Sequence, residues 1–60
     1  MTYKEYCDNK LIKAAEAYNE YALTGNEEKY TEWQMRQGDH QTTVMFFHEQ
    51  GYDPNSEMPD

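Results

Sequence analysis

Alternating steps of four and three residues run through the first half of the chain and most limit what it can fold into. Apolar or aromatic side chains recur at these steps, at Cys7, Leu11, Ala14, Tyr18 and Tyr21. The spacing places all of them on one side of a helix, and it is typical of a helix that packs along another helix. The sequence therefore predicts an all-α fold in which these residues form a packing seam.

Local signals define the ends of the first helix. Thr2 followed by Glu5 is a capping-box pattern, in which each side chain can bond the backbone N–H of the other residue. Gly25 suits the left-handed conformation that closes a helix. Asn26 can then cap the next helix, because its short side chain accepts a hydrogen bond from a free backbone amide. We therefore expect a first helix over about 3–23.

The second half of the chain has two interpretations. Gly38 followed by Asp39 is a stop-and-restart signal, which predicts helices over about 27–37 and 40–50, the second ending at Gly51. Alternatively, Gly38 is tolerated inside one continuous helix, at a cost of about 1 kcal/mol relative to alanine. The sequence thus predicts either a helical hairpin or a small three-helix unit.

The chain is too short to bury a large core. At 60 residues it hides only about 60% of the surface that its unfolded form exposes. Small domains usually need a disulfide, a metal or a partner subunit, and Cys7 is the only cysteine. We expect residues 1–51 to form a single helical domain, completed by homodimerisation. The acidic, proline-containing segment 52–60 is expected to be a disordered tail.

Charge is distributed unevenly along the chain. Residues 1–24 carry three lysines against four acidic residues, whereas residues 25–60 carry two basic residues against eight acidic ones, and none of the basic ones follows Arg36. Direct binding of nucleic acid or of an anionic membrane needs clustered cations, so both are disfavoured. With no secretory signal and no apolar run near the ~20 residues that span a bilayer, we expect a cytoplasmic protein.

No set of residues in the sequence has the spacing of a known catalytic or metal site. His40 and His48 are eight positions apart, which on a helix separates them by two turns and about 80°. The spacings typical of zinc sites, such as CxxC and HxxxH, are absent. Cys7 lies on the apolar seam, where cysteine usually acts as a small hydrophobic residue. We therefore predict no enzyme activity, no cofactor and no metal site.

Exposed aromatic and acidic side chains point instead to protein binding. The chain has nine aromatic residues, more than a monomer of this size can bury, and exposed rings with a polar rim are typical of interfaces. We predict an acidic interaction module with a larger, basic protein partner. The candidate partner-binding residues are Glu27, Glu28, Glu32, Asp39, Glu49, Tyr30, Trp33, Met35 and Phe46.

Two versions of this function remain open. In the first, the carboxylates imitate phosphates and occupy the basic groove of a nucleic-acid-handling protein, as small phage or mobile-element inhibitors can do; this rests on analogy of class alone. In the second, the chain is a structural or accessory subunit that assembles through an apolar helical interface, and its acidic surface serves only solubility. Binding through carboxylates should weaken in salt, whereas an apolar interface should survive it.

Overall fold

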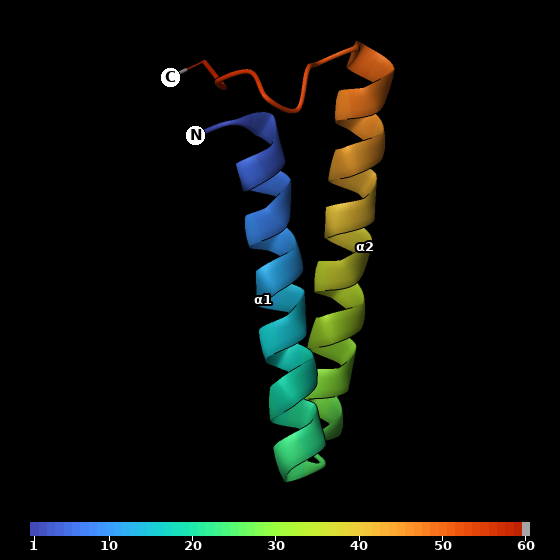
Figure 1. Cartoon of the computed structure of the whole chain (residues 1–60). Coiled ribbons are helices and arrows are strands. Elements are labelled where there is room, and N and C mark those ends of the chain that lie inside the picture. The colour runs from blue at the N-terminus through green and yellow to red at the C-terminus, as the bar shows by residue number, and fades with distance from the viewer. Residues whose placement is uncertain (60) are drawn as a thin grey trace.

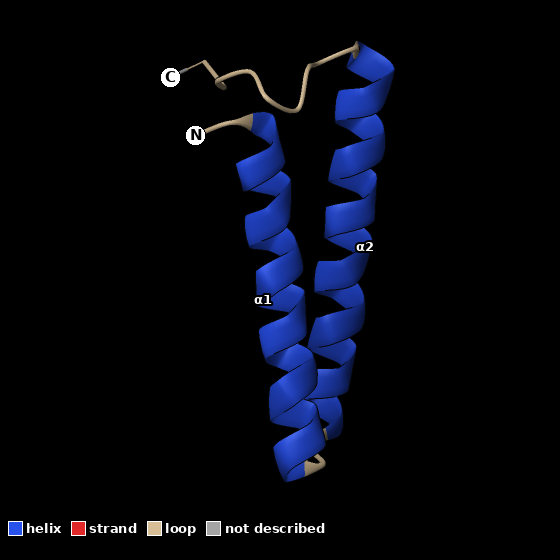
Figure 2. Ribbon diagram, in the orientation of Figure 1, coloured by secondary structure: helices blue, strands red, loops and turns tan. Residues whose placement is uncertain are grey.

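The computed structural model describes residues 1–59 and shows an antiparallel helical hairpin (Figures 1 and 2). Helix α1 spans Tyr3–Thr24 and helix α2 spans Glu27–Gln50. At 1.5 Å per residue the helices are roughly 33 and 36 Å long, and together they form a rod of 39 × 19 × 15 Å. The predicted all-α class is confirmed, and of the two predicted arrangements the structure has the hairpin.

The predicted caps are present at the start of both helices and at the bend. The Glu5 amide donates to Thr2 Oγ1 and the Thr2 amide donates to Glu5 Oε1, both at 3.1 Å. Gly25 has a left-handed φ of 69°, and the Asn26 side chain accepts a hydrogen bond from the Glu28 amide at 3.0 Å. Short side chains and one glycine therefore reverse the chain within two residues.

Gly38 lies inside α2 and does not interrupt it. The half-buried residues Trp33, His40 and Phe47 follow one another at steps of seven along the side of α2 that meets α1. Packing against α1 thus occurs both before and after Gly38. These contacts offset the ~1 kcal/mol by which glycine is less favourable than alanine within a helix. The separate helices over 27–37 and 40–50 merge into one.

Only small side chains are buried between the two helices. Ala14 and Ala17 are 1% and 2% exposed, and no larger side chain is fully buried in residues 1–59. Aromatic rings lie on either side of these alanines. Near the bend they are Tyr18, Tyr21, Tyr30 and Trp33, and near the chain ends they are Tyr3, Tyr6, Phe47 and Tyr52. The small alanines bring the helices together, and the rings pack around the contact.

The packing seam of α1 differs from the predicted one at alternate positions. Leu11 and Tyr18 are 49% and 45% exposed, and the inner positions beside them belong to Lys10 and Ala17. Ala17 allows close approach of α2, while Lys10 reaches across to Asp39. The helix is therefore rotated by part of a turn from the predicted orientation. The other three predicted seam residues are buried or half-buried, at Cys7, Ala14 and Tyr21.

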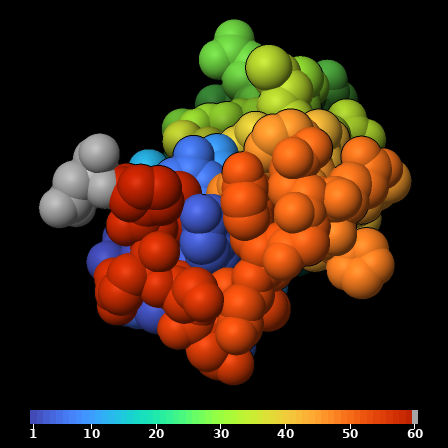
Figure 3. Space-filling model, turned by 90° about the horizontal axis from the view of Figure 1, so that it is seen from above, coloured from blue at the N-terminus to red at the C-terminus, as the bar shows by residue number. Residues whose placement is uncertain are grey.

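The segment after α2 differs from the predicted disordered tail, because residues 52–59 fold back over the start of α1. The amides of Tyr3 and Lys4 donate to the carbonyls of Ser56 and Pro54, at 3.1 and 2.9 Å. Figure 3, which looks down on this end, shows the tail (red) against the start of α1 (blue). The first amides of a helix have no partner within it, and the tail supplies acceptors for two of them. Asp60 lies outside the described residues.

Side-chain and backbone contacts hold the same segment in place. The Tyr52 ring stacks on Tyr3 with their centroids 4.7 Å apart. The Met58 amide donates to the Met1 carbonyl at 2.9 Å, and the Met1 ammonium pairs with Glu57 at 2.6 Å. That hydrogen bond raises the pKa of the Met1 amine. Composition suggested disorder, but the order comes from contacts between the two ends of the chain.

Candidate interaction surface

Three polar contacts join the helices along one side of the hairpin, which we call the polar ladder. They link Lys10 Nζ to Asp39 Oδ2 at 2.6 Å, Arg36 Nη1 to the Lys13 carbonyl at 2.9 Å, and Lys29 Nζ to Glu20 Oε2 at 3.0 Å. The hydrogen bond to Asp39 raises the pKa of Lys10, and the one to Glu20 contributes most to raising the pKa of Lys29. Polar and charged contacts between the two helices therefore cover this side of the hairpin.

Glu32 belongs to the same side. Its carboxylate accepts a hydrogen bond from Lys29 at 3.1 Å and also pairs with Arg36. The Lys29 hydrogen bond, with the Arg36 and Lys29 charges, lowers the pKa of Glu32. The carboxylate is therefore held ionised by residues of its own helix.

The other side of the hairpin exposes apolar side chains from both helices, and we call it the open face. It comprises Leu11 and Tyr18 of α1 with Tyr30 and Val44 of α2, which are 49%, 45%, 38% and 41% exposed. Each follows an inner position by one residue. In two antiparallel right-handed helices, one step forward along either chain turns toward the same side of the pair. The four side chains therefore share one face.

The helical positions of the open face carry little net formal charge. Helix geometry places Lys4 and Asp8 on this side, and they pair with each other at 3.4 Å. Of the other helix positions that flank the face, Glu27 beside the bend carries a formal charge, and the rest are Ala15, Ala22, Gln34, Gln37, Gln41 and His48. The charged contacts between the helices lie on the opposite side, which also exposes Met35 and Phe46.

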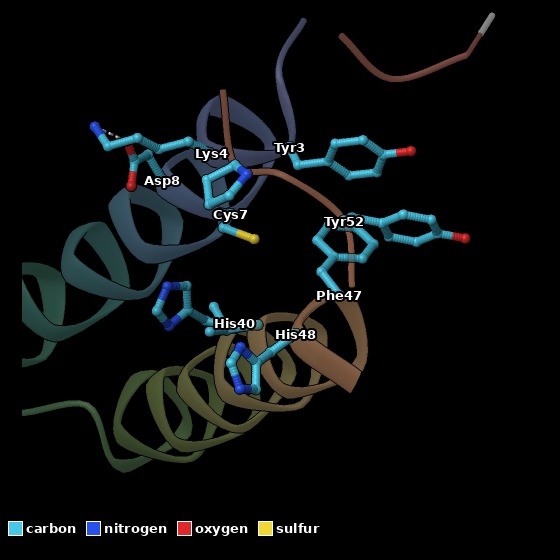
Figure 4. A pocket seen from close by; sticks show the side chains of 10 residues that line it. Tyr3, Lys4, Cys7, Asp8, His40, Phe47, His48 and Tyr52 are labelled. Atoms are coloured by element: carbon cyan, nitrogen blue, oxygen red, sulfur yellow. Dashed lines mark hydrogen bonds and ion pairs between the residues drawn. The ribbon is translucent and has the colours of Figure 1, made fainter. Parts of the chain in front are cut away.

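A cavity of about 300 Å³ lies at the end of the open face near the chain ends. Figure 4 shows the rings of Tyr3, Phe47 and Tyr52 on one side of it, with the Cys7 sulfur pointing into the hollow. Val44 also lines the cavity, and it belongs to the open face. The cavity is therefore a continuation of that face, roofed in part by the folded tail.

The Cys7 thiol is one of the polar groups that line this cavity. Burial raises the pKa of the Cys7 thiol, which keeps it protonated and weakens it as a nucleophile. Across residues 1–59, no group of three or more His, Cys, Asp or Glu side chains is placed to hold a metal ion. Neither of the two described helices is long and apolar enough to cross a membrane. The lining combines an apolar wall with the Cys7 thiol, the imidazoles of His40 and His48, and the Lys4–Asp8 pair.

The predicted acidic partner-binding residues are dispersed in the structure. Glu32 and Asp39 pair with cations of this chain on the polar ladder side. Glu27 and Glu28 lie in the first turn of α2, where the helix dipole stabilises negative charge. Glu49 lies near the other end of α2, about 32 Å from Glu28 along the axis. These carboxylates do not form one concentrated site.

The predicted aromatic and methionine contacts are also divided. Trp33 packs between Tyr18 and Tyr30, with ring centroids 5.2 and 5.3 Å away. Met35 and Phe46 are 71% and 51% exposed. Five residues at ~100° each place Met35 about 140° around α2 from Tyr30, and Phe46 lies within about 20° of the line of Met35. Only Tyr30, and Trp33 beneath it, adjoin the open face.

Sequence reasoning missed the open face because it assigned Leu11 and Tyr18 to the interior. A seam that uses Lys10 and Ala17 has the same alternating spacing, but it places a lysine at an inner position and was not predicted. The signal that distinguishes the two seams is Asp39, the partner of Lys10 on the other helix. No protein-family model, curated protein or solved structure matches this chain.

Proposed function

We propose that this protein is an interaction module that assembles with a helical protein surface through its open face, and that its acidic residues keep it soluble. The observation that carries the proposal is the two-sided character of the hairpin. Leu11, Tyr18, Tyr30 and Val44 remain between 38% and 49% exposed on a side with little net charge. Large half-exposed apolar side chains grouped in this way are typical of interfaces.

The distribution of carboxylates supports this version over phosphate imitation. Glu32 and Asp39 are already paired with Lys29 and Lys10, so a basic partner would have to displace cations of the chain itself. Imitation of a phosphate backbone needs free carboxylates gathered on one surface. Along α2 the carboxylates without such pairs lie near its two ends.

A basic partner is a second candidate, and the ion pairs favour it in one respect. Within residues 1–59, Lys4, Lys10, Lys29 and Arg36 all pair with carboxylates. The net charge of −7 is therefore presented mostly by carboxylates without a cation beside them. Such a field attracts a basic protein at long range and is screened by salt.

Matched variants separate the two candidates. Leu11 and Ile12 are neighbours with similar exposure, 49% and 53%, but Ile12 lies on the outer side of α1. Partners captured from an extract of the source cells should be lost with Leu11→Glu and retained with Ile12→Glu. They should also survive about 1 M salt, where the screening length is only ~3 Å.

The opposite pattern would support the basic partner. In that case capture would fail in high salt and with a Glu27→Gln, Glu28→Gln double variant, and Leu11→Glu would bind normally. If wild type and Leu11→Glu captured the same proteins at every salt concentration, the open face would have no role in binding and the proposal would be wrong.

A further inference from the structure

We propose that the partner on the open face is a second copy of this chain, which gives a symmetric dimer of two hairpins. The inference rests on the proposed function and names its partner. It is carried by three properties of the hairpin: the size of its core, the charge of the open face and the area of that face.

The first property is the small core. Two alanines are the only fully buried side chains in residues 1–59. The accessible surface is 4676 Å², whereas a compact monomer of 7.2 kDa is expected to expose about 4,100 Å². The isolated hairpin is therefore more open than its mass predicts. A second hairpin on the open face would cover Leu11, Tyr18, Tyr30 and Val44 and convert a two-layer contact into a four-helix core.

The second property is the charge of the face. In a two-fold symmetric dimer the same patch lies on both sides of the interface, so any net charge on the patch meets itself. Most of the chain's surface would repel a copy, since the net charge is −7. The open face limits this repulsion because Lys4 and Asp8 pair with each other and, of the flanking helix positions, only Glu27 beside the bend carries a formal charge. It is the side on which two acidic copies can meet.

The third property is area. The broad side of the rod measures 39 × 19 Å, which is about 740 Å² in projection, and a stable interface buries roughly 800 Å² on each partner. One face of the hairpin, with the tail and the bend included, is thus close to the area that a stable dimer needs. The cavity beside Val44 and Cys7 lies within the same contact.

The test is the mass of the full chain in solution. Sedimentation equilibrium from about 1 µM to about 500 µM spans the affinities of weak and moderate dimers. The wild type should approach twice 7.2 kDa, and Ile12→Glu should behave in the same way. Leu11→Glu should remain monomeric, with its dissociation constant raised at least about 100-fold, because the interface would then bury one unpaired carboxylate from each copy. Helicity by circular dichroism checks that both variants fold.

A second measurement uses the wild type alone and remains decisive if Leu11→Glu does not fold. The Cys7 sulfur points into the cavity that the second copy would cover. Its reaction with a maleimide should therefore slow as the protein concentration rises through the dimerisation range. A dimer formed through another face would leave this rate unchanged, and so would a monomer; either result would overturn the proposal.

The outcomes also separate this inference from the proposed function. A chain that stays at 7.2 kDa throughout, yet loses a captured partner with Leu11→Glu, has a functional open face and a different occupant. A dimer that dissociates equally with Leu11→Glu and Ile12→Glu does not use the open face. Both results refute the symmetric dimer, and only the first leaves the interaction module intact.

Discussion

Replacing Gly38 with alanine is expected to stabilise the hairpin. Gly38 lies inside α2 with an ordinary helical φ, and no heavy atom lies within 4 Å of the position that a Cβ would take. The added methyl group therefore meets no neighbour and buries little surface. Its effect comes from the backbone, because glycine has more conformational freedom to lose on folding than alanine has.

The magnitude follows from helix propensity. Alanine is more favourable than glycine in a helix interior by roughly 0.8–1.0 kcal/mol. In a domain of this size, 1 kcal/mol shifts the melting temperature by roughly 4–8 °C. Thermal unfolding followed by circular dichroism should thus show a rise of several degrees for Gly38→Ala. The protein concentration must be the same for both samples, since self-association makes the melting temperature depend on it.

Gly25 and Gly51 provide matched controls. A Cβ at either position would also meet nothing within 4 Å, but their φ values are 69° and 74°. The left-handed conformation costs a residue with a Cβ roughly 1–2 kcal/mol, so Gly25→Ala and Gly51→Ala should lower the melting temperature. If Gly38→Ala also lowered it, α2 would not be continuous at that position and the three-helix arrangement would regain support.

Three other perturbations test the packing and the ion pairs. Trp33→Ala should cost about 3 kcal/mol in urea unfolding, because the indole packs between two tyrosines, whereas Trp33→Phe should cost less. Ala17→Leu should destabilise by about 1–3 kcal/mol in the same assay, since Ala17 is 2% exposed where the helices meet. The pKa of Glu32 is lowered in the folded state, chiefly by the hydrogen bond from Lys29, so its contribution is present above the unfolded pKa of about 4.3 and is lost as the pH falls through the folded pKa. Glu32→Gln should therefore be less stable than the wild type at pH 7 and should lose less stability between about pH 5 and pH 2; an equal loss would show that the ion pairs of Glu32 do not form.

The sequence predicts the features that depend on a few adjacent residues. The capping box at Thr2, the cap at Asn26, the left-handed Gly25 and the helix end at Gly51 are all confirmed. Each of these signals needs only a short side chain or a missing Cβ at one position, and neighbouring residues supply the rest of the geometry. The hairpin follows once the two helices and the two-residue bend are placed.

The rotation of the helices depends on contacts that a single periodic pattern does not contain. Two seams with the same spacing compete on α1, one through Leu11 and the other through Lys10. The structure uses the second, in which Ala17 lies at the helix contact and Lys10 pairs with Asp39, a residue 29 positions away. The open face, which is the candidate site, is a product of that rotation and was therefore not identified from the sequence.

The order of the tail has a similar origin. Residues 52–59 have the composition of a solvated segment, with few apolar side chains of their own. Their hydrogen-bond partners are the unpaired amides at the start of α1 and the Met1 carbonyl, which are far away in sequence. The composition of this segment describes it in isolation. In the folded hairpin it is held by hydrogen-bond donors and acceptors of residues that are distant in the sequence.

The antiparallel arrangement also fixes how much chain entropy each contact costs. The Arg36 contact to the Lys13 carbonyl closes a loop of 23 residues, the Lys10–Asp39 pair closes 29, and the Met1–Glu57 pair closes 56. The entropy lost on loop closure grows with loop length, so contacts near the bend have the smallest entropic cost. Once these contacts have formed, the next pair of helical turns is already close together. We expect the helices to join progressively from Gly25 toward the chain ends. The ion pair between Met1 and Glu57 then forms last, and we expect it to be the first contact to open in the native protein.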